Sequence, residues 1–296
     1  MYQRTRNFIS NIKIRYIFFD VSMKKNHISN LFDIHDKNIV LTGSAGLLGS
    51  HYANFLSSYG ANLILIDVNE KENQKLEKSI RSKYDTKCNF YTCDLSNVKE
   101  IKDLTKLILK DFKTIDVLIN NAAYTTKSSI NKKVKKTSFE EFPYDTWKNS
   151  LSVNLTAVFL FCQEFGKIML KQKNGIIVNI SSIYGMIGAD QRIYEQSNFN
   201  LPISYAATKG SIINITKYLA AYWQKKNIRV NTLSLGGVKD PTYHHQNFIK
   251  KYSNKTMLGR MANKSDFDGA LLFLISEASS YATGTNLIVD GGWTAW

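Results

Sequence analysis

The chain has 296 residues, of which 44% are hydrophobic, so it can bury the core of one large α/β domain or two small ones. Its net charge of +15 comes from basic residues scattered along the sequence, without a helix-turn-helix, zinc-finger or RNA-binding motif, which argues against a nucleic-acid partner. No apolar run reaches the roughly 18 residues that a membrane span needs, so we expect no span.

The cysteines Cys88, Cys93 and Cys162 form neither a Cys-x-x-Cys pair nor a Cys/His spacing suited to a metal. We therefore expect no metal site. Thiols that stay reduced are typical of a reducing compartment, which indicates a cytoplasmic protein.

Residues 1–37 are basic and contain a short apolar stretch, Ile14 to Phe19, which Arg15 interrupts and no small-residue cleavage site follows. The pattern faintly resembles a targeting peptide, but these two features depart from one. Two explanations stay open, namely a true translation start at Met23, with a mis-annotated or disordered extension before it, or a genuine peripheral tail. We expect the folded domain to span residues 38–296.

From residue 38 onward, short runs rich in β-branched residues alternate with segments of helical periodicity. The predicted strands are Asn38–Thr42, Asn62–Asp67, Cys88–Cys93, Ile115–Asn120, Gly175–Ser181, Ile228–Ser234 and Asn286–Asp290. The predicted helices include Leu47–Tyr59, Val98–Lys110 and Ser204–Lys225. This alternation, without a linker or repeat, predicts a single doubly wound Rossmann-type α/β domain with a seven-stranded parallel sheet and helices on both faces.

A glycine-rich turn, residues 42–49, joins the first predicted strand to the helical segment that follows it. Glycines in this context allow a tight turn and close approach of the backbone to a pyrophosphate, while the helix N-terminus offers N–H groups to phosphates. The turn is therefore a candidate dinucleotide-binding loop. The residues expected to contact the cofactor there are Gly43, Ser44, Gly46, Leu47 and Leu48.

Asp67 ends the second predicted strand. A carboxylate at this place can accept hydrogen bonds from the adenosine ribose hydroxyls and repels a 2′-phosphate. Neither Ala45 in the turn nor Val68 after the aspartate supplies a positive charge. NAD is therefore expected as the cofactor rather than NADP, and the alternative for Asp67 is a simple turn residue at the end of a strand.

With the later motifs included, the sequence from about residue 38 to its end resembles the short-chain dehydrogenase/reductase family. Besides the glycine-rich turn, the motifs that carry the resemblance are Asp94-Leu95, Asn120 to Ala123, Ser152 to Thr156, Asn179 to Ser182, Tyr205 to Lys209, Arg229 to Asn231, Gly284 and Val289 to Gly292. Their shared order and spacing make coincidence improbable. The resemblance implies a nicotinamide-dependent oxidoreductase that acts on CH–OH groups.

The resemblance also implies cofactor contacts further along the chain. Asp94, followed by Leu95, would bind the adenine amino group, Asn121 and Ala122 would line the adenosine side, and Val238 would meet the nicotinamide carboxamide. Two positions depart from the family pattern. Leu47 stands where short members usually have glycine, and Leu235 occupies the usual proline position in the nicotinamide loop.

Four residues are the candidate catalytic set. Tyr205 would be the acid/base, and Lys209, one helical turn later, would lower its pKa and reach the nicotinamide ribose. Ser182 would hydrogen-bond the substrate oxygen, with Ser181 as a near-equivalent candidate. The resemblance implies that Asn154 holds a water that relays protons towards Lys209. Each residue also has a purely structural alternative. Tyr205 and Lys209 could be a pair on one face of an amphipathic helix, Ser182 could be a helix cap, and Asn154 could hydrogen-bond the backbone.

The interval between Ser182 and Tyr205 is longer than is usual in the family, and its extra residues would lie beside the catalytic mouth. They include Tyr194, Glu195, Gln196, Asn198 and Phe199. A second long segment, Tyr124–Tyr144, contains Lys127, Lys132, Lys133, Lys135 and Lys136. Both could form a polar lid over a hydrophilic substrate, although a solvated lysine-rich loop explains the second segment equally well.

The motifs Ser182 to Gly185, Tyr194-Glu195 and Pro202 to Tyr205 are similar to a bacterial subgroup named flagellin-modification protein A, associated with surface-sugar biosynthesis. That resemblance implies a polar small-molecule substrate, a sugar or a nucleotide sugar. The family also implies a homodimer or homotetramer, in which the aromatic C-terminal segment Leu287–Trp296 would suit an interface.

Three alternative functions remain. A 3-oxoacyl carrier-protein reductase, or another general carbonyl reductase, would use a basic face to dock an acidic carrier, but Asp67 disfavours the NADPH such enzymes usually take. A sugar dehydratase or epimerase suits the glycine spacing at residues 43, 46 and 49, yet few residues follow Lys209 to build a substrate domain. A non-catalytic, nucleotide-sensing regulator would not need Tyr205 and Lys209.

Overall fold

The computed structural model describes residues 28–125, 137–195, 200–240, 242 and 244–296. Its strands form one parallel sheet in the order β3-β2-β1-β4-β5-β6-β7. The strands are β1 Asn38–Thr42, β2 Asn62–Asp67, β3 Cys88–Thr92, β4 Val117–Asn120, β5 Gly175–Ser182, β6 Ile228–Leu235 and β7 Asn286–Val289. All seven predicted strands are confirmed, with ends that differ by at most two residues.

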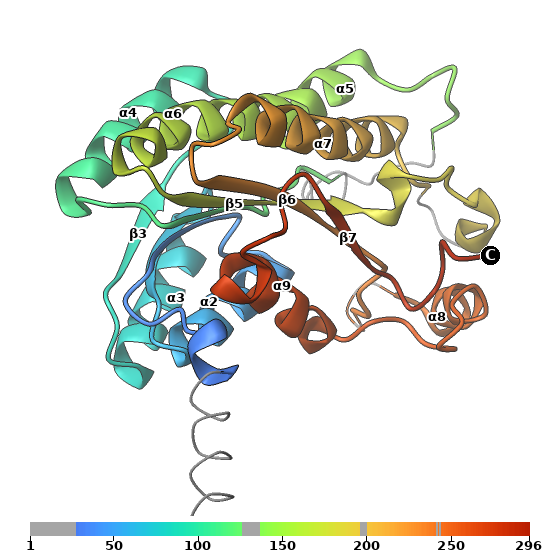
Figure 1. Ribbon diagram of the computed structural model, residues 1–296. Helices are drawn as coiled ribbons and strands as arrows, with labels where there is room; N and C mark the ends of the chain where they lie inside the picture. The colour runs from blue at the N-terminus through green and yellow to red at the C-terminus, as the bar shows by residue number, and fades with distance from the viewer. Residues whose placement is uncertain (1–27, 126–136, 196–199, 241, 243) are drawn as a thin grey trace, which may run out of the picture.

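Helices cover both faces of the sheet, which confirms the predicted doubly wound architecture (Figure 1). One face carries α4 Val98–Asp111, α5 Tyr144–Leu151, α6 Ala157–Gln172 and α7 Ile203–Tyr222, and the other carries α2 Leu47–Ser58, α3 Glu70–Lys83 and α9 Asp268–Ile275. A short helix, α8 Gln246–Ser253, lies beyond one end of the sheet near the C-terminus.

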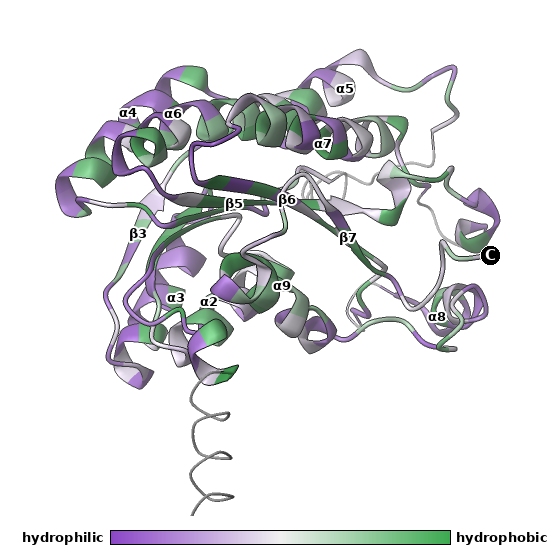
Figure 2. Ribbon diagram, viewed as in Figure 1, coloured by the Kyte–Doolittle hydropathy of each residue, from purple (hydrophilic) through white to green (hydrophobic). Residues whose placement is uncertain are grey.

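Successive strand residues point to opposite faces, so each central strand contributes to two cores. In β1, Ile39 and Leu41 join the cluster beneath α2 and α9, whereas Val40 joins the cluster beneath α4 and α6. Figure 2 shows the result, with hydrophobic strands between helices whose outer surfaces are hydrophilic. The continuous apolar runs of the sequence are therefore the signature of strands buried on both sides.

Local sequence also sets the helix ends. Asn69 and Asn97 cap α3 and α4, because each side-chain oxygen accepts a hydrogen bond from a backbone N–H of the first turn. The carboxylate of Glu100 accepts a hydrogen bond of 2.8 Å from the Asn97 amide. These caps fix where each helix begins after its strand.

The domain begins before residue 38. Ile34 is buried in the core, and the Asp36 N–H donates a hydrogen bond of 2.9 Å to the Gly60 carbonyl. Phe32 also packs against this core, so folded residues precede the boundary predicted at 38. Residues 1–27, with the proposed start at Met23, lie outside the described residues.

Among the described residues, one continuous helix, Tyr144–Gln172, is long and apolar enough by length and composition to cross a membrane. It consists of α5, a π-helical turn η1 (Ser152–Thr156) and α6. Phe161, Phe165 and Met169 are buried on the face that packs against the sheet. This packing explains its apolar composition as that of a core helix.

Gly49 must remain glycine for α2 to leave the turn, because a Cβ there would overlap the Gly43 carbonyl oxygen. We expect Gly49→Ala to lower the free energy of unfolding by about 2 kcal/mol or more, a typical cost of overpacking. Gly269→Ala is the control, because a Cβ there meets nothing within 4 Å and alanine favours a helix. Urea midpoints measure both, and equal stabilities of the two variants would contradict the argument.

Candidate active site

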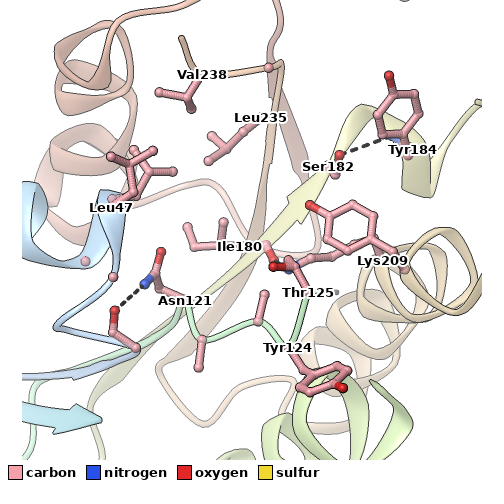
Figure 3. Close-up of a pocket in the computed structure, with 18 of the residues that line it drawn as sticks. Leu47, Asn121, Tyr124, Thr125, Ile180, Ser182, Tyr184, Lys209, Leu235 and Val238 are labelled. Carbon is pink, nitrogen blue, oxygen red and sulfur yellow. Dashed lines mark hydrogen bonds between the residues drawn. The ribbon is translucent and has the colours of Figure 1, made fainter. Parts of the chain in front are cut away.

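A cavity of about 850 Å³ opens at the carboxyl ends of the strands. Its lining runs from the glycine-rich turn after β1 to the segment between β5 and α7. Figure 3 shows Leu47 and Asn121 on one side of the cavity and Ser182 and Tyr184 on the other. In a doubly wound sheet this edge is the expected ligand site, since β1 and β4 lead to helices on opposite faces.

The glycine-rich turn packs closely against the chain that follows β4, where a side chain at Gly43 would not fit. Gly43 has a φ of +67°, and a Cβ there would lie 2.7 Å from the Ala122 Cα. Gly46 precedes α2, whose first turn has no side-chain cap and no acidic residue. The first N–H groups of α2 can therefore bind phosphate groups, so these residues fit a dinucleotide.

Asp67 lies at the end of β2 beside this turn. One of its carboxylate oxygens accepts the Ala45 N–H at 2.9 Å and the other accepts the Asn69 N–H at 2.9 Å. The side chain also lines the cavity. Its position thus allows the ribose contact expected from the sequence, while the backbone bonds fix its orientation.

Most of the predicted cofactor residues come together around this cavity. Those that line it are Gly43, Gly46, Leu47, Leu48, Asp67, Asp94, Leu95, Asn121, Ala122, Tyr205, Lys209 and Val238. Ser44 does not. Its buried hydroxyl donates a hydrogen bond of 2.7 Å to the Asn73 side chain of α3, so this side chain turns away from the cavity, and a cofactor contact of Ser44 stays a prediction.

Thr42 and Asn121 join the ends of β1 and β4. The Asn121 amide donates to the Thr42 carbonyl at 3.0 Å, and the Thr42 hydroxyl accepts the N–H groups of Asn121 and Ala122 at 3.0 and 3.1 Å. Asn121 therefore contributes to the site by holding two loops together. Sequence analysis identified Asn121 as a site residue but assigned no role to Thr42. The Thr42 hydroxyl acts through Asn121, which lies 79 residues away along the chain.

Three of the four predicted catalytic residues line the cavity at its other end, namely Ser182, Tyr205 and Lys209. Ser182 ends β5 and is buried, whereas Tyr205 and Lys209 come from the first two turns of α7. The Lys209 Nζ donates a hydrogen bond of 2.7 Å to the Ile180 carbonyl and lies 5.7 Å from the centre of the Tyr205 ring.

Burial controls the protonation of this pair. Loss of solvent lowers the pKa of Lys209 to about 8. Burial also raises the pKa of Tyr205, and a hydrogen bond from Ser182 acts in the opposite direction. Burial is the larger influence, so the phenol stays protonated at neutral pH, and the lowering of this pKa that we expected from Lys209 stays a prediction.

Asn154 lies in the π-helical turn η1 and does not line the cavity. Its side chain forms two hydrogen bonds with the backbone of Tyr124, accepting the N–H at 2.6 Å and donating to the carbonyl at 3.1 Å. A longer contact of 3.4 Å reaches the Thr208 hydroxyl. Asn154 thus holds the chain after β4 against α7, one residue from Lys209.

The structure also separates the two serine candidates. The Ser181 hydroxyl donates a hydrogen bond of 2.8 Å to the Lys209 carbonyl, which ties β5 to α7. The Ser182 hydroxyl accepts the Tyr184 N–H at 3.3 Å and faces the cavity (Figure 3). Both serines line the cavity, and the hydrogen bond that holds Ser181 to α7 favours Ser182 as the candidate.

Sequence reasoning missed part of the cavity wall. Tyr184, His244, Phe248 and Tyr252 line it together with Tyr194 of the long interval. The α8 residues gave no recognisable motif and lie far along the chain from Ser182. Of the other predicted lid residues, Glu195 is described, whereas Gln196, Asn198, Phe199 and the lysines at 127, 132, 133, 135 and 136 lie outside the described residues.

Comparison with known proteins agrees with this geometry. A family model described as Enoyl-(Acyl carrier protein) reductase matches residues 43–294. Trans-4-hydroxycyclohexanecarboxylate dehydrogenase of Sinomonas cyclohexanicum is 31% identical, with 88% of this chain and 94% of the relative covered. A D-arabinitol 2-dehydrogenase of Candida albicans is 30% identical, with 90% and 95% covered.

A crystal structure of a short-chain dehydrogenase from Leptospira borgpetersenii with bound NAD+ is 35% identical, with a TM-score of 0.74 and coverage of 88% of this chain and 94% of that chain. Both NAD+ and NADP occur in solved structures that match. A 3-oxoacyl carrier-protein reductase is also among the relatives.

The buried Lys209 makes stability depend on pH. Its folded pKa of about 8 lies below its ordinary value of 10.5, so between these values the unfolded chain binds more protons and stability rises with pH. Relative to Lys209→Met, we expect the wild type to gain on the order of 3 kcal/mol from pH 8 to 10.5. Urea unfolding at each pH measures the difference in the free energy of unfolding between the wild type and Lys209→Met. A difference that stays constant over this pH range would count against a lowered pKa of Lys209.

Proposed function

Because this chain belongs to the short-chain dehydrogenase/reductase family, we propose that it transfers a hydride between NAD and a hydroxyl or keto group of its substrate. The alcohol and polyol dehydrogenases among its relatives act on such CH–OH groups. The substrate that we propose is neutral, polyhydroxylated and sugar-like. The observation that carries this proposal is the single cavity that joins the glycine-rich turn to Ser182, Tyr205 and Lys209. Cofactor and substrate can therefore meet at one place.

The nicotinamide ring supplies or accepts the hydride when it is bound. In reduction, the neutral phenol of Tyr205 donates its proton to the substrate oxygen, and its raised pKa keeps that proton available. The Ser182 hydroxyl, which is hydrogen-bonded with Tyr205, orients the same oxygen. Lys209 in its charged form stabilises the tyrosinate that remains.

Asn154 acts on this chemistry from outside the cavity. It fixes the backbone at Tyr124, which itself lines the cavity, and it contacts Thr208 beside Lys209. We propose that it is a positioning residue. The family resemblance implies that Asn154 also holds a water that relays protons towards Lys209. We keep this water relay as part of the proposal.

The hydroxyl groups of Ser182, Tyr194 and Tyr205 along the cavity suit a hydroxylated substrate. The subgroup resemblance points towards sugars used in surface glycans. A nucleotide sugar would bring a second diphosphate that needs cations. Among the lining residues that the structure describes, Lys209 is the one lysine or arginine. We therefore favour an uncharged sugar or polyol over a nucleotide sugar.

We further propose a homo-oligomer in the cytoplasm. Phe159 of α6 and Tyr218 and Tyr222 of α7 are large apolar side chains that are each more than half exposed on neighbouring helices. The cysteines are buried and unpaired, as suits a reducing compartment.

Tyr205→Phe tests the catalytic assignment. We expect the rate of NAD+ reduction with D-arabinitol or cyclohexanol to fall at least about 100-fold, since the group that takes up the proton of the alcohol is lost, while NADH binding stays within twofold. Tyr281→Phe removes the same atom from a fully exposed ring and should leave the rate unchanged. Undiminished turnover in Tyr205→Phe would show that another group moves the proton. Nucleotide binding by the wild type without any turnover would favour the non-catalytic regulator.

Asp67→Ser tests the cofactor preference. The wild type should prefer NAD+ to NADP+. Removal of the carboxylate should lower the ratio of kcat/KM with NAD+ to kcat/KM with NADP+ by at least about tenfold, because repulsion of the 2′-phosphate disappears. Asp103→Ser, which removes an exposed carboxylate from α4, controls for net charge. An unchanged ratio in Asp67→Ser would mean that the carboxylate does not face the ribose.

A further inference from the structure

We propose that Tyr194 and His244 are specificity-determining residues of a subsite that receives a second hydroxyl group of the substrate, beyond the carbon that reacts. This inference rests on the proposed function and identifies where the polyhydroxylated character of the substrate would be recognised. The subsite belongs to one wall of the cavity, which we call the distal wall and define as Tyr184, Tyr194, His244, Phe248 and Tyr252.

The distal wall is an aromatic row assembled from three segments. Tyr184 belongs to the 3₁₀ turn η2 (Ile183–Gly185) and Tyr194 to the 3₁₀ turn η3 (Gln191–Tyr194), whereas the others lie in or just before α8. Ring centres are 5.2 Å apart for Tyr194 and Phe248, and 4.8 Å apart for His244 and Phe248. Such ring faces suit the C–H face of a cyclic or extended polyol, whose hydroxyl groups then need partners at the edges.

Tyr194 supplies one of those partners. Its hydroxyl lies 3.3 Å from that of Tyr184, and both side chains are buried. Burial raises the pKa of each phenol well above the ordinary value, so both stay protonated at neutral pH. A pair of protonated phenols has two donors and several lone pairs, which matches a substrate hydroxyl that both donates and accepts.

His244 supplies the second partner in a defined tautomer. The backbone N–H of Asp240 donates to its Nδ1 at 3.1 Å. Because a backbone N–H can only donate, Nδ1 must accept, and the proton of the neutral ring is on Nε2. The ring lines the cavity, so Nε2 is a donor suited to a hydroxyl oxygen.

Ion pairs hold η3 against α8 and thereby keep the distal wall in place. The Lys251 Nζ contacts Glu195 at 2.9 Å and the Arg192 carbonyl at 3.0 Å, and the Lys255 Nζ contacts Asp190 at 2.9 Å. Asp190 also caps η3 by accepting the Arg192 N–H. A wall fixed before binding loses little entropy when it meets a substrate, which is what a specificity site requires.

The test compares two probes that differ by one hydroxyl group, cyclohexanol and trans-1,2-cyclohexanediol. Steady-state kcat and KM with NAD+ are measured for the wild type, Tyr194→Phe, His244→Phe and Tyr281→Phe. Tyr281 is fully exposed, so its variant is the matched control for loss of a phenol oxygen. The Kd of each probe for the protein saturated with NAD+ is measured by calorimetry in parallel.

We expect Tyr194→Phe and His244→Phe each to raise KM for the diol about tenfold and to leave kcat for the diol within twofold, since the lost contact acts on binding alone. Values for cyclohexanol should stay within twofold, and Tyr281→Phe should match the wild type. Equal losses for both probes, or no loss for the diol, would overturn the subsite while leaving the proposed oxidoreductase intact.

The binding measurement keeps the two proposals distinguishable. If the wild type oxidised neither probe, the proposed function would fail for these substrates, but the diol should still bind about tenfold more tightly than cyclohexanol and lose that advantage in both variants. Equal Kd values for diol and cyclohexanol in the wild type would overturn the subsite regardless of turnover.

Discussion

The contact between the end of β5 and the start of α7 holds the reacting groups in place, and the rest of the site is arranged around it. Two hydrogen bonds cross this contact in opposite directions, from the Lys209 Nζ to the Ile180 carbonyl and from the Ser181 hydroxyl to the Lys209 carbonyl. Gly185 permits the close approach, because a Cβ there would lie 2.6 Å from the Lys209 backbone. Strand and helix are thus joined where Ser182 and Tyr205 emerge.

This contact also explains the protonation states of the site. Lys209 is buried, and the loss of solvent makes its charge costly and lowers its pKa. The same burial keeps the proton on Tyr205. A proton donor and a nearby amine of lowered pKa therefore arise from the packing of one helix against one strand.

Much of the site could be predicted from sequence because its chemistry follows local spacing. The short-range patterns are the glycines after a buried strand, Asp67 at the end of the next strand, and Tyr205 four residues before Lys209. The residues of all three patterns line the cavity. Features that depend on distant neighbours could not be predicted in this way. Ser44 turns away to Asn73 of α3, and the pKa of Tyr205 depends on burial that no motif encodes. The distal wall joins segments separated by about fifty residues without a periodic pattern.

The π-helical turn η1 makes the site sensitive to chain length. This turn wraps an extra residue into the helix between α5 and α6, and Asn154 lies within it. Because the wide turn absorbs its extra residue locally, removing one residue there would restore an α-helix while α5 and α6 keep the faces they present. Phe161 and Phe165 would stay against the sheet, but the wide turn that places Asn154 against Tyr124 would be lost. A single-residue deletion at this turn would therefore spare the core and remove the contact that fixes the chain after β4.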